Sequence, residues 1–113
     1  MVGFAADQVA REGTASLREV ADRPEHVRDV AGPDCVGLGA GYDTGTTHAD
    51  GLTDVSRCPQ LVAELLERDR PESDTAALTW GNAVRVMREA EFAARAEQLR
   101  RTPSTATIGE PDR

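Results

Sequence analysis

Val36-Gly37-Leu38-Gly39-Ala40-Gly41-Tyr42-Asp43 is the stretch of this chain that decides its fold. Val36 and Leu38 are apolar residues that favour strands, and the glycines between them allow close approach of another backbone. We therefore predict a short buried strand over residues 35–39 that runs directly into a loop. In parallel α/β folds, the loop at the C-terminal end of such a strand commonly carries the functional residues.

The segment before this stretch predicts a helix, a turn and a possible second strand. Residues 2–6 are apolar and form either a strand or a frayed end, and residues 7–14 are polar and read as a connection. Residues 16–31 place apolar side chains at helical spacing. Pro24 interrupts this pattern, so either the helix kinks there or a second helix starts near Asp22. Helix, short turn and strand in this order indicate a parallel unit.

The segment after this stretch predicts a long loop over residues 40–56 and then further helices. Ser56 is expected to cap a helix that carries Pro59 in its first turn. Ser73 is expected to cap a short helix that ends near Trp80, whose ring we expect to be buried at the junction with the last helix. Asn82 is expected to cap that last helix, which ends near residue 101.

Four sequence blocks carry a resemblance to a known family. The first is Val-Gly-Leu-Gly-x-x-Tyr-Asp, and the second is Gly-Leu-x-Asp-Val-Ser-x-x-Pro-x-Leu over residues 51–61. The others are Glu64-Leu65-Leu66-Glu67-Arg68 and Trp80-Gly81-Asn82-Ala83-Val84-Arg85-Val86. In this order and spacing, the blocks resemble the C-terminal part of the zinc membrane dipeptidases, the renal dipeptidase family.

The resemblance implies a (β/α)₈ parent fold, which needs about 250 residues. This chain has 113 residues. We therefore expect an α/β fold that is a C-terminal fragment of a (β/α)₈ TIM-type barrel, with one or two parallel strands and three to four helices. We expect the barrel segment to cover residues 1–101 and residues 102–113 to form a flexible tail.

The resemblance also places two substrate-binding positions on the loop, at Gly41 and Asp43. The family has an aspartate at the position of Gly41, which is associated with the substrate amino group and the zinc-bound water. Glycine has no side chain for either role, and Thr44 replaces a family glycine. Asp43 keeps its family position, where it either turns toward the site or, as we favour, bonds its own loop backbone.

The metal ligands of the family have no counterpart in this chain, because they lie on earlier strands. The two histidines, His26 and His48, lie on a predicted helix and in a loop, and a catalytic zinc site needs at least three protein ligands. Cys35 and Cys58 form neither a disulfide framework nor a zinc motif. The acidic run after Glu64 lacks calcium-loop spacing and reads as a solvated helix face. We expect no metal site, no cofactor and no catalytic residue in this chain.

Charge and hydropathy exclude several kinds of partner. The net charge is −7 at pH 7, which opposes binding to nucleic acid and to anionic membrane surfaces. We find no apolar run of membrane-spanning length and no leader pattern, so we expect a cytoplasmic protein.

Three interpretations of function remain open. The first is a truncated dipeptidase-like protein that is inactive alone, with a dipeptide as the substrate implied by the family. The second is a non-catalytic interaction module that docks to another chain, or to itself, through a strand edge and apolar helix faces. The third is a decaying gene product without a selected role.

Overall fold

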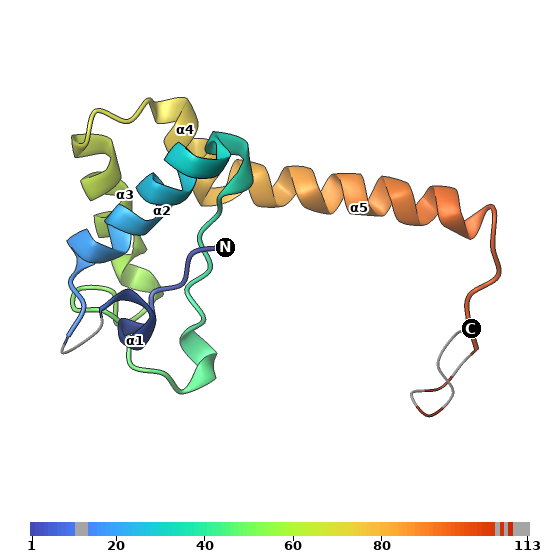
Figure 1. Ribbon diagram of the computed structural model, residues 1–113, viewed down its shortest axis with the longest axis horizontal. Helices are drawn as coiled ribbons and strands as arrows, with labels where there is room; N and C mark the ends of the chain where they lie inside the picture. The colour runs from blue at the N-terminus through green and yellow to red at the C-terminus, as the bar shows by residue number, and fades with distance from the viewer. Residues whose placement is uncertain (11–13, 106, 108, 110–113) are drawn as a thin grey trace. The chain divides into compact units, whose positions relative to one another are not determined.

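The structure is a computed structural model that describes residues 1–10, 14–105, 107 and 109. Within these residues it is mostly helical (Figure 1), and isolated β-bridges stand where strands were predicted. The helices are α1 (Ala6–Val9), α2 (Leu17–Ala31), α3 (Cys58–Glu67), α4 (Glu72–Ala76) and α5 (Asn82–Gln98). The predicted helical part of the fold is therefore present, whereas the prediction of one or two strands is wrong. Among the described residues, no helix is both long and apolar enough to span a membrane.

Helix α2 begins where the sequence predicts it. The Ser16 hydroxyl accepts the Glu19 N–H, and the Glu19 carboxylate accepts the Ser16 N–H at 2.7 Å, which forms a capping box. The helix continues through Pro24, which is buried together with Val20 and Ala21. The alternative of a second helix starting near Asp22 is therefore wrong, because α2 runs as one element to Ala31.

Residues 2–6 and 36–39 run parallel but pair at a single point. Val2 N–H donates to the Gly37 carbonyl (2.7 Å), and Gly39 N–H donates to the Val2 carbonyl (3.0 Å). These bonds make one parallel bridge between Val2 and Leu38, in place of the strand predicted over residues 35–39. Two isolated strands are rarely stable in water, and the glycines of this pair offer no side chains for cross-strand packing. The predicted parallel direction is right, but the predicted length is not.

The other edge of residues 2–6 is covered by residues 47–49. Ala6 N–H donates to the Thr47 carbonyl (2.8 Å), and Ala49 N–H donates to the Phe4 carbonyl (2.9 Å). This is an antiparallel bridge between Ala5 and His48. Helix α1 directly follows, so part of the predicted connection over residues 7–14 is helical, while residues 11–13 lie outside the described residues.

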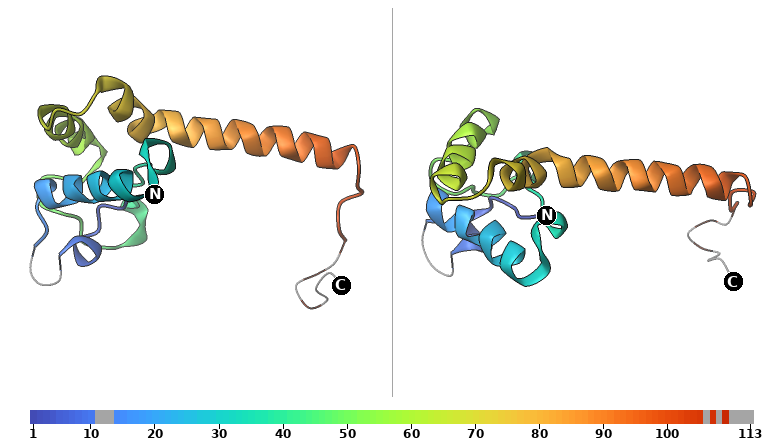
Figure 2. Two further views of the ribbon diagram at one scale, coloured as in Figure 1. Left: turned by 45° about the horizontal axis from the view of Figure 1, so that its top comes forward. Right: turned by 90° about the horizontal axis from the view of Figure 1, so that it is seen from above.

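Helix α3 packs against α2 to form the core of the first compact unit, Met1–Ala83. Figure 2 shows these two helices side by side from further directions. Leu61 and Leu65 of α3 are buried, together with Phe4 and Leu52. The predicted cap at Ser56 is wrong: the Asp54 carboxylate accepts the Ser56 N–H at 2.8 Å and caps the short turn that leads into α3. Aspartate and serine both serve as caps, so sequence alone did not separate them.

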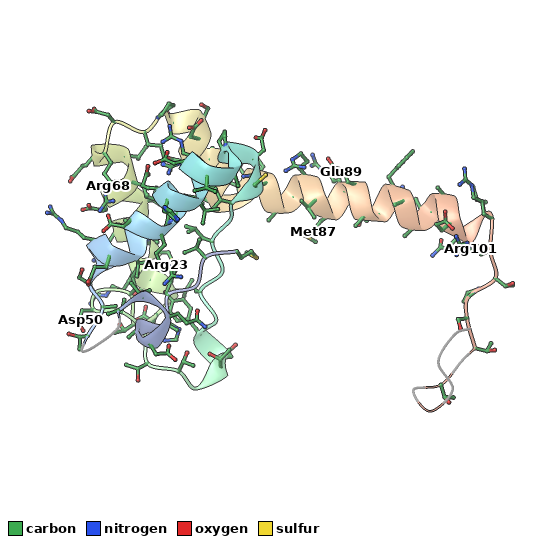
Figure 3. The ribbon with its side chains drawn as sticks, viewed as in Figure 1. Arg23, Asp50, Arg68, Met87, Glu89 and Arg101 are labelled. Atoms are coloured by element: carbon green, nitrogen blue, oxygen red, sulfur yellow. The ribbon has the colours of Figure 1, made fainter. Side chains whose placement is uncertain are left out.

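Two arginine side chains in the connection between α3 and α4 form ion pairs with acidic residues of α2. Figure 3 shows Arg68 at the end of α3. Its guanidinium lies 2.6 Å from the Asp22 carboxylate and 2.9 Å from the Glu64 carboxylate. Arg70 is almost fully buried, with a side-chain exposure of 1%, and pairs with Glu25. These ion pairs fix the position of the α3–α4 connection on α2.

Helix α4 leads through a π turn, Ala77–Gly81, directly into α5. Two predicted caps are therefore wrong, because Ser73 lies inside α4 and Asn82 lies inside continuous helix. Trp80 is 62% exposed, so the prediction that its ring is buried is also wrong. Leu78 is the buried residue of the π turn, and it takes the anchoring position that was predicted for tryptophan.

The second compact unit is Val84–Arg113. Four large apolar side chains of this unit are exposed: Val86, Met87, Phe92 and Leu99. Residues 106, 108 and 110–113 of the predicted tail lie outside the described residues, and the boundary at residue 101 stays a prediction.

Candidate functional site

The loop after residue 39 begins with a left-handed glycine. Gly41 has φ 68° and ψ 36°, and residues 42–44 then form a tight turn that ends at Gly45, with φ 74°. The Thr44 hydroxyl donates to the Gly41 carbonyl at 2.7 Å and lies 2.9 Å from the Thr46 hydroxyl. The loop conformation is therefore held by threonine hydroxyl groups and by two glycines with positive φ.

The position of Gly41 has room for a side chain. A Cβ atom added there would lie 3.7 Å from the nearest atom, a Thr44 methyl carbon, which is an ordinary contact. The positive φ disfavours most residues, but aspartate and asparagine tolerate it better than others. The space and the backbone conformation are thus compatible with the aspartate that the sequence resemblance places here.

Asp43 is exposed on the turn after Gly41. Its carboxylate has no hydrogen bond or ion pair to any described residue, so it does not bond the loop backbone as we favoured from the sequence. Thr44 makes that loop bond instead. The structure therefore leaves the Asp43 carboxylate accessible, whereas the carboxylates of Glu19 and Asp54 are engaged in caps.

Tyr42 is the residue that joins this loop to the core. Its ring packs edge-on against the Phe4 ring, with 6.2 Å between centroids, and lies tilted against the His48 ring, with 4.7 Å between centroids. Its hydroxyl lies 3.7 Å from the Cys58 sulfur. Partial burial, followed by the contact with Cys58, raises the pKa of Tyr42 above its ordinary value. Tyr42 therefore stays neutral at physiological pH and acts as an anchor, a role that sequence reasoning missed although Tyr42 lies in the first block.

His48 is positioned by a backbone carbonyl. Its Nε2 atom lies 3.2 Å from the Ala40 carbonyl oxygen. A carbonyl only accepts hydrogen bonds, so Nε2 carries the proton in this arrangement. The His48 ring therefore holds the segment around residue 48 against the start of the loop at Ala40.

A cavity of about 260 Å³ opens beside Gly41. The parallel segments themselves line it through Gly3, Phe4, Ala5 and Gly39, and the start of the loop and Gln8 close it, with Thr44 and Thr46 at its rim. None of the described residues that line the cavity is charged. Gln8 was not singled out from the sequence, because a single glutamine in a polar segment carries no pattern.

The described residues do not fit a catalytic zinc ion. Among them, no three histidine, cysteine or acidic residues come together in a group that could hold a metal. His26 lies on α2 and His48 lies in the loop, and each is engaged in a different part of the fold. Cys35 is exposed, and Cys58 contacts Tyr42.

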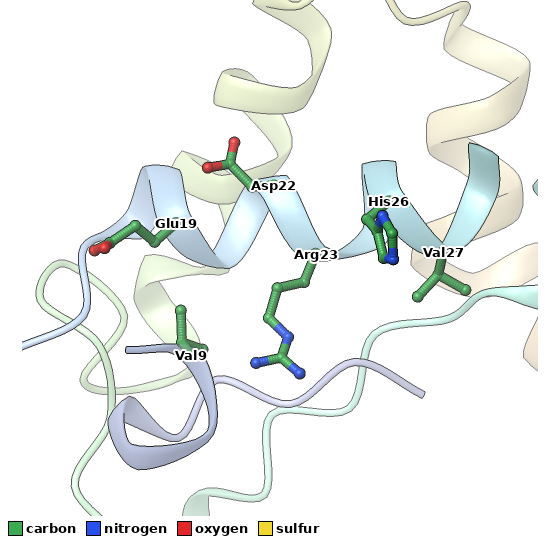
Figure 4. Close-up of a pocket in the computed structure, with 6 residues that line it drawn as sticks. All are labelled: Val9, Glu19, Asp22, Arg23, His26 and Val27. Atoms are coloured by element: carbon green, nitrogen blue, oxygen red, sulfur yellow. The ribbon is translucent and has the colours of Figure 1, made fainter. Parts of the chain in front are cut away.

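A larger cavity, of about 390 Å³, lies between α1 and α2 (Figure 4). Arg23 extends from α2 toward Val9, and His26 lies one turn further along the helix. The two acidic residues that line this cavity are engaged elsewhere, since Glu19 closes the capping box and Asp22 pairs with Arg68. This cavity brings together no residues that were predicted to be functional.

Comparisons with known proteins identify similar sequences. A family model described as membrane dipeptidase, peptidase family M19, matches residues 1–101. Dipeptidase 3 of Macaca fascicularis is 40% identical over 77 residues, which are 68% of this chain and 16% of that protein. Dipeptidase aclJ of Aspergillus oryzae is 41% identical over 81 residues, 72% of this chain and 19% of that protein. Dipeptidase tcpJ of Claviceps purpurea is 34% identical over 84 residues, 74% of this chain and 20% of that protein. The chain thus spans about one fifth, or less, of these relatives.

Proposed function

Because the chain belongs to the membrane dipeptidase family, peptidase family M19, we propose that it is the C-terminal segment of a dipeptide-hydrolysing barrel. Family membership implies a (β/α)₈ parent fold, in which the active site lies at the carboxyl ends of the strands. The match over residues 1–101 is the observation that carries this proposal. In this role, the loop after residue 39 forms one wall of the substrate site.

The geometry of the loop supports this role. The cavity beside Gly41 is lined by both parallel segments and by the start of the loop, and the accessible carboxylate of Asp43 lies on the adjoining turn. A carboxylate there is suited to pair with the ammonium group of a dipeptide. Gly41 contributes only backbone to this wall.

We further propose that the chain alone does not hydrolyse dipeptides. The described residues provide no group that could hold a metal, and the position of the family's aspartate is occupied by Gly41. General acid–base groups typically contribute about 10²- to 10⁴-fold to a rate, so the missing carboxylate alone predicts a strongly impaired site. A cytoplasmic location stays part of this proposal.

A chimera tests the role of the segment. Residues 1–101 would replace the aligned part of dipeptidase aclJ, and hydrolysis of a dipeptide would be compared with that of the unmodified host. We expect a folded, metal-loaded chimera with at least about 100-fold lower kcat, partly restored by Gly41→Asp. The matched control, Gly45→Asp, adds a carboxylate four residues away and should restore nothing. Host-level activity with Gly41 in place would contradict the proposal.

A second candidate function is a non-catalytic docking module. The observation that favours it is the set of exposed apolar side chains on α5, Val86, Met87 and Phe92, together with Leu99 directly after the helix. Size-exclusion chromatography with light scattering distinguishes the two candidates. A defined complex that is lost in a Met87→Glu, Phe92→Glu variant would support docking, and a monomer at all concentrations would exclude self-association through these side chains.

A further inference from the structure

The outer edge of residues 36–38 is covered by the π turn and by Asn82. Leu38 N–H donates to the Leu78 carbonyl at 3.3 Å. The Asn82 side-chain amide donates to the Val36 carbonyl and to the Pro33 carbonyl, each at 2.7 Å. Asn82 is buried, and these partners are 46 and 49 residues away in sequence. The contacts therefore fill the backbone edge at which a further strand would pair.

The π turn is stabilised by its own hydrogen bonds. Asn82 N–H donates to the Ala77 carbonyl, five residues earlier, and the Thr79 hydroxyl donates to the Thr75 carbonyl at 2.8 Å. A Cβ atom on Gly81 would lie 3.4 Å from the Ala76 carbonyl oxygen, which is an ordinary contact, so the turn has room for a small side chain at this position. π turns are rare; they appear mostly as single turns inside α-helices, frequently at functional sites.

With the outer edge of residues 36–38 covered, both outer edges of the two parallel segments are hydrogen-bonded within the chain. The opposite edge, along residues 2–6, already bonds to Thr47 and Ala49. Uncovered strand edges present unpaired N–H and C=O groups that pair with other chains. Residues 35–40, Cys-Val-Gly-Leu-Gly-Ala, contain neither a charged residue nor a proline, the two residue types that commonly block such pairing.

We propose that the π turn Ala77–Gly81 and Asn82 form an edge lock, which keeps residues 36–38 from pairing with the same edge of a second copy of this chain. The second copy is the partner that the sequence fits, because two identical uncharged edges meet without like-charge repulsion. The net charge of −7 still opposes close approach of two chains. Association of an unlocked chain should therefore strengthen as salt screens this repulsion. The lock describes this chain by itself and does not depend on dipeptidase activity; within a complete barrel, the same edge would pair with a neighbouring strand instead.

Hydrogen exchange and sedimentation equilibrium on the full chain test the lock. Asn82→Leu and Asn82→Asp remove both amide donors, and we expect the Leu38 amide to exchange about 10- to 100-fold faster in either variant. We also expect both variants to self-associate, more strongly at high salt, at concentrations where the unmodified chain is monomeric. Gln98→Leu removes an exposed amide from the same helix and should change neither readout.

A second control separates edge pairing from general destabilisation. Val20→Ala weakens the core without touching the edge, so it should stay monomeric. Folded Asn82 variants that stay monomeric, or that keep the wild-type exchange rate at Leu38, would overturn the proposal. If the variants lose their helical circular dichroism, the unmodified chain decides: an unprotected Leu38 amide in the wild type would also overturn the proposal.

Discussion

The buried ion pair between Arg70 and Glu25 predicts an asymmetric response to mutation. The Arg70 side chain is 1% exposed, and the Glu25 side chain is 25% exposed. Arg70 Nε lies 2.8 Å from a Glu25 carboxylate oxygen, and Arg28 lies 3.4 Å from the other oxygen. Glu25 therefore has a second cationic partner and contact with solvent, whereas the buried positive charge of Arg70 is compensated by Glu25.

The burial and the partners of each side chain set the expected loss in the free energy of unfolding for each substitution. Arginine cannot lose its proton, so Glu25→Gln leaves a buried uncompensated charge, which typically costs about 3–5 kcal/mol. Because Glu25 is partly exposed, we expect the lower end, about 3 kcal/mol. Arg70→Met leaves Glu25 with Arg28 and also removes Arg70 Nη1, a buried donor with no hydrogen-bond partner among the described residues. Relief of that donor offsets part of the loss, so we expect about 1 kcal/mol.

Urea unfolding of the two variants measures this difference directly. The free energy of unfolding should fall more for Glu25→Gln than for Arg70→Met, and the double variant Glu25→Met, Arg70→Met should be close to wild type. The control is Arg85→Met, which removes a half-exposed partner of Glu89 and should cost under about 1 kcal/mol. A larger loss for Arg70→Met than for Glu25→Gln would refute this reasoning.

Three further predictions concern α2, the loop and the π turn. Hydrogen bonds from the Ser16 backbone N–H and hydroxyl lower the pKa of Glu19 in the folded chain. The contribution of this contact to folding stability should therefore be complete above pH 4.5, the ordinary pKa of the group, and be lost as the pH falls below it. Glu19→Gln should remove this pH dependence in thermal unfolding. Gly41→Asp should cost about 1 kcal/mol in urea unfolding and Gly41→Val more, and equal losses would contradict the left-handed backbone at this position. Trp80 should show solvent-exposed fluorescence that is readily quenched by iodide, and Trp80→Ala should change stability by under about 0.5 kcal/mol; a blue-shifted, protected emission would contradict its exposure.

The features that sequence analysis predicted well depend on local patterns. Helix α2 follows from its apolar spacing and from the Ser16–Glu19 capping box, both of which lie within one segment. The family resemblance follows from four short blocks, which the family match confirms. Each of these signals can be read from the sequence alone, as a pattern within one segment or as the order of short blocks, so no knowledge of tertiary contacts is required.

The features that sequence analysis missed depend on distant partners. The strand over residues 35–39 needs neighbouring strands, which the described residues replace with single bridges. Asn82 looks like a helix cap, but its side chain bonds to Pro33 and Val36. Trp80 was expected to be buried because of its size, whereas Leu78 takes that position through the register of the π turn.

In the loop, one prediction stays open and one contact was missed. The resemblance placed the substrate-binding positions at Gly41 and Asp43; the structure puts Gly41 beside a cavity and Asp43 on the adjoining turn, and their role stays a prediction. The tie between Tyr42, His48 and Cys58 could not be predicted, because it joins positions up to 16 residues apart through ring and sulfur contacts.

The most direct test of the account is turnover of a dipeptide by the purified chain in the presence of excess zinc. We predict a rate equal to that of the buffer with zinc alone, for both the natural chain and Gly41→Asp, since a restored carboxylate has no metal-bound water to act on. Sustained zinc-dependent release of amino acids by the natural chain, removed by a chelator, would contradict the account.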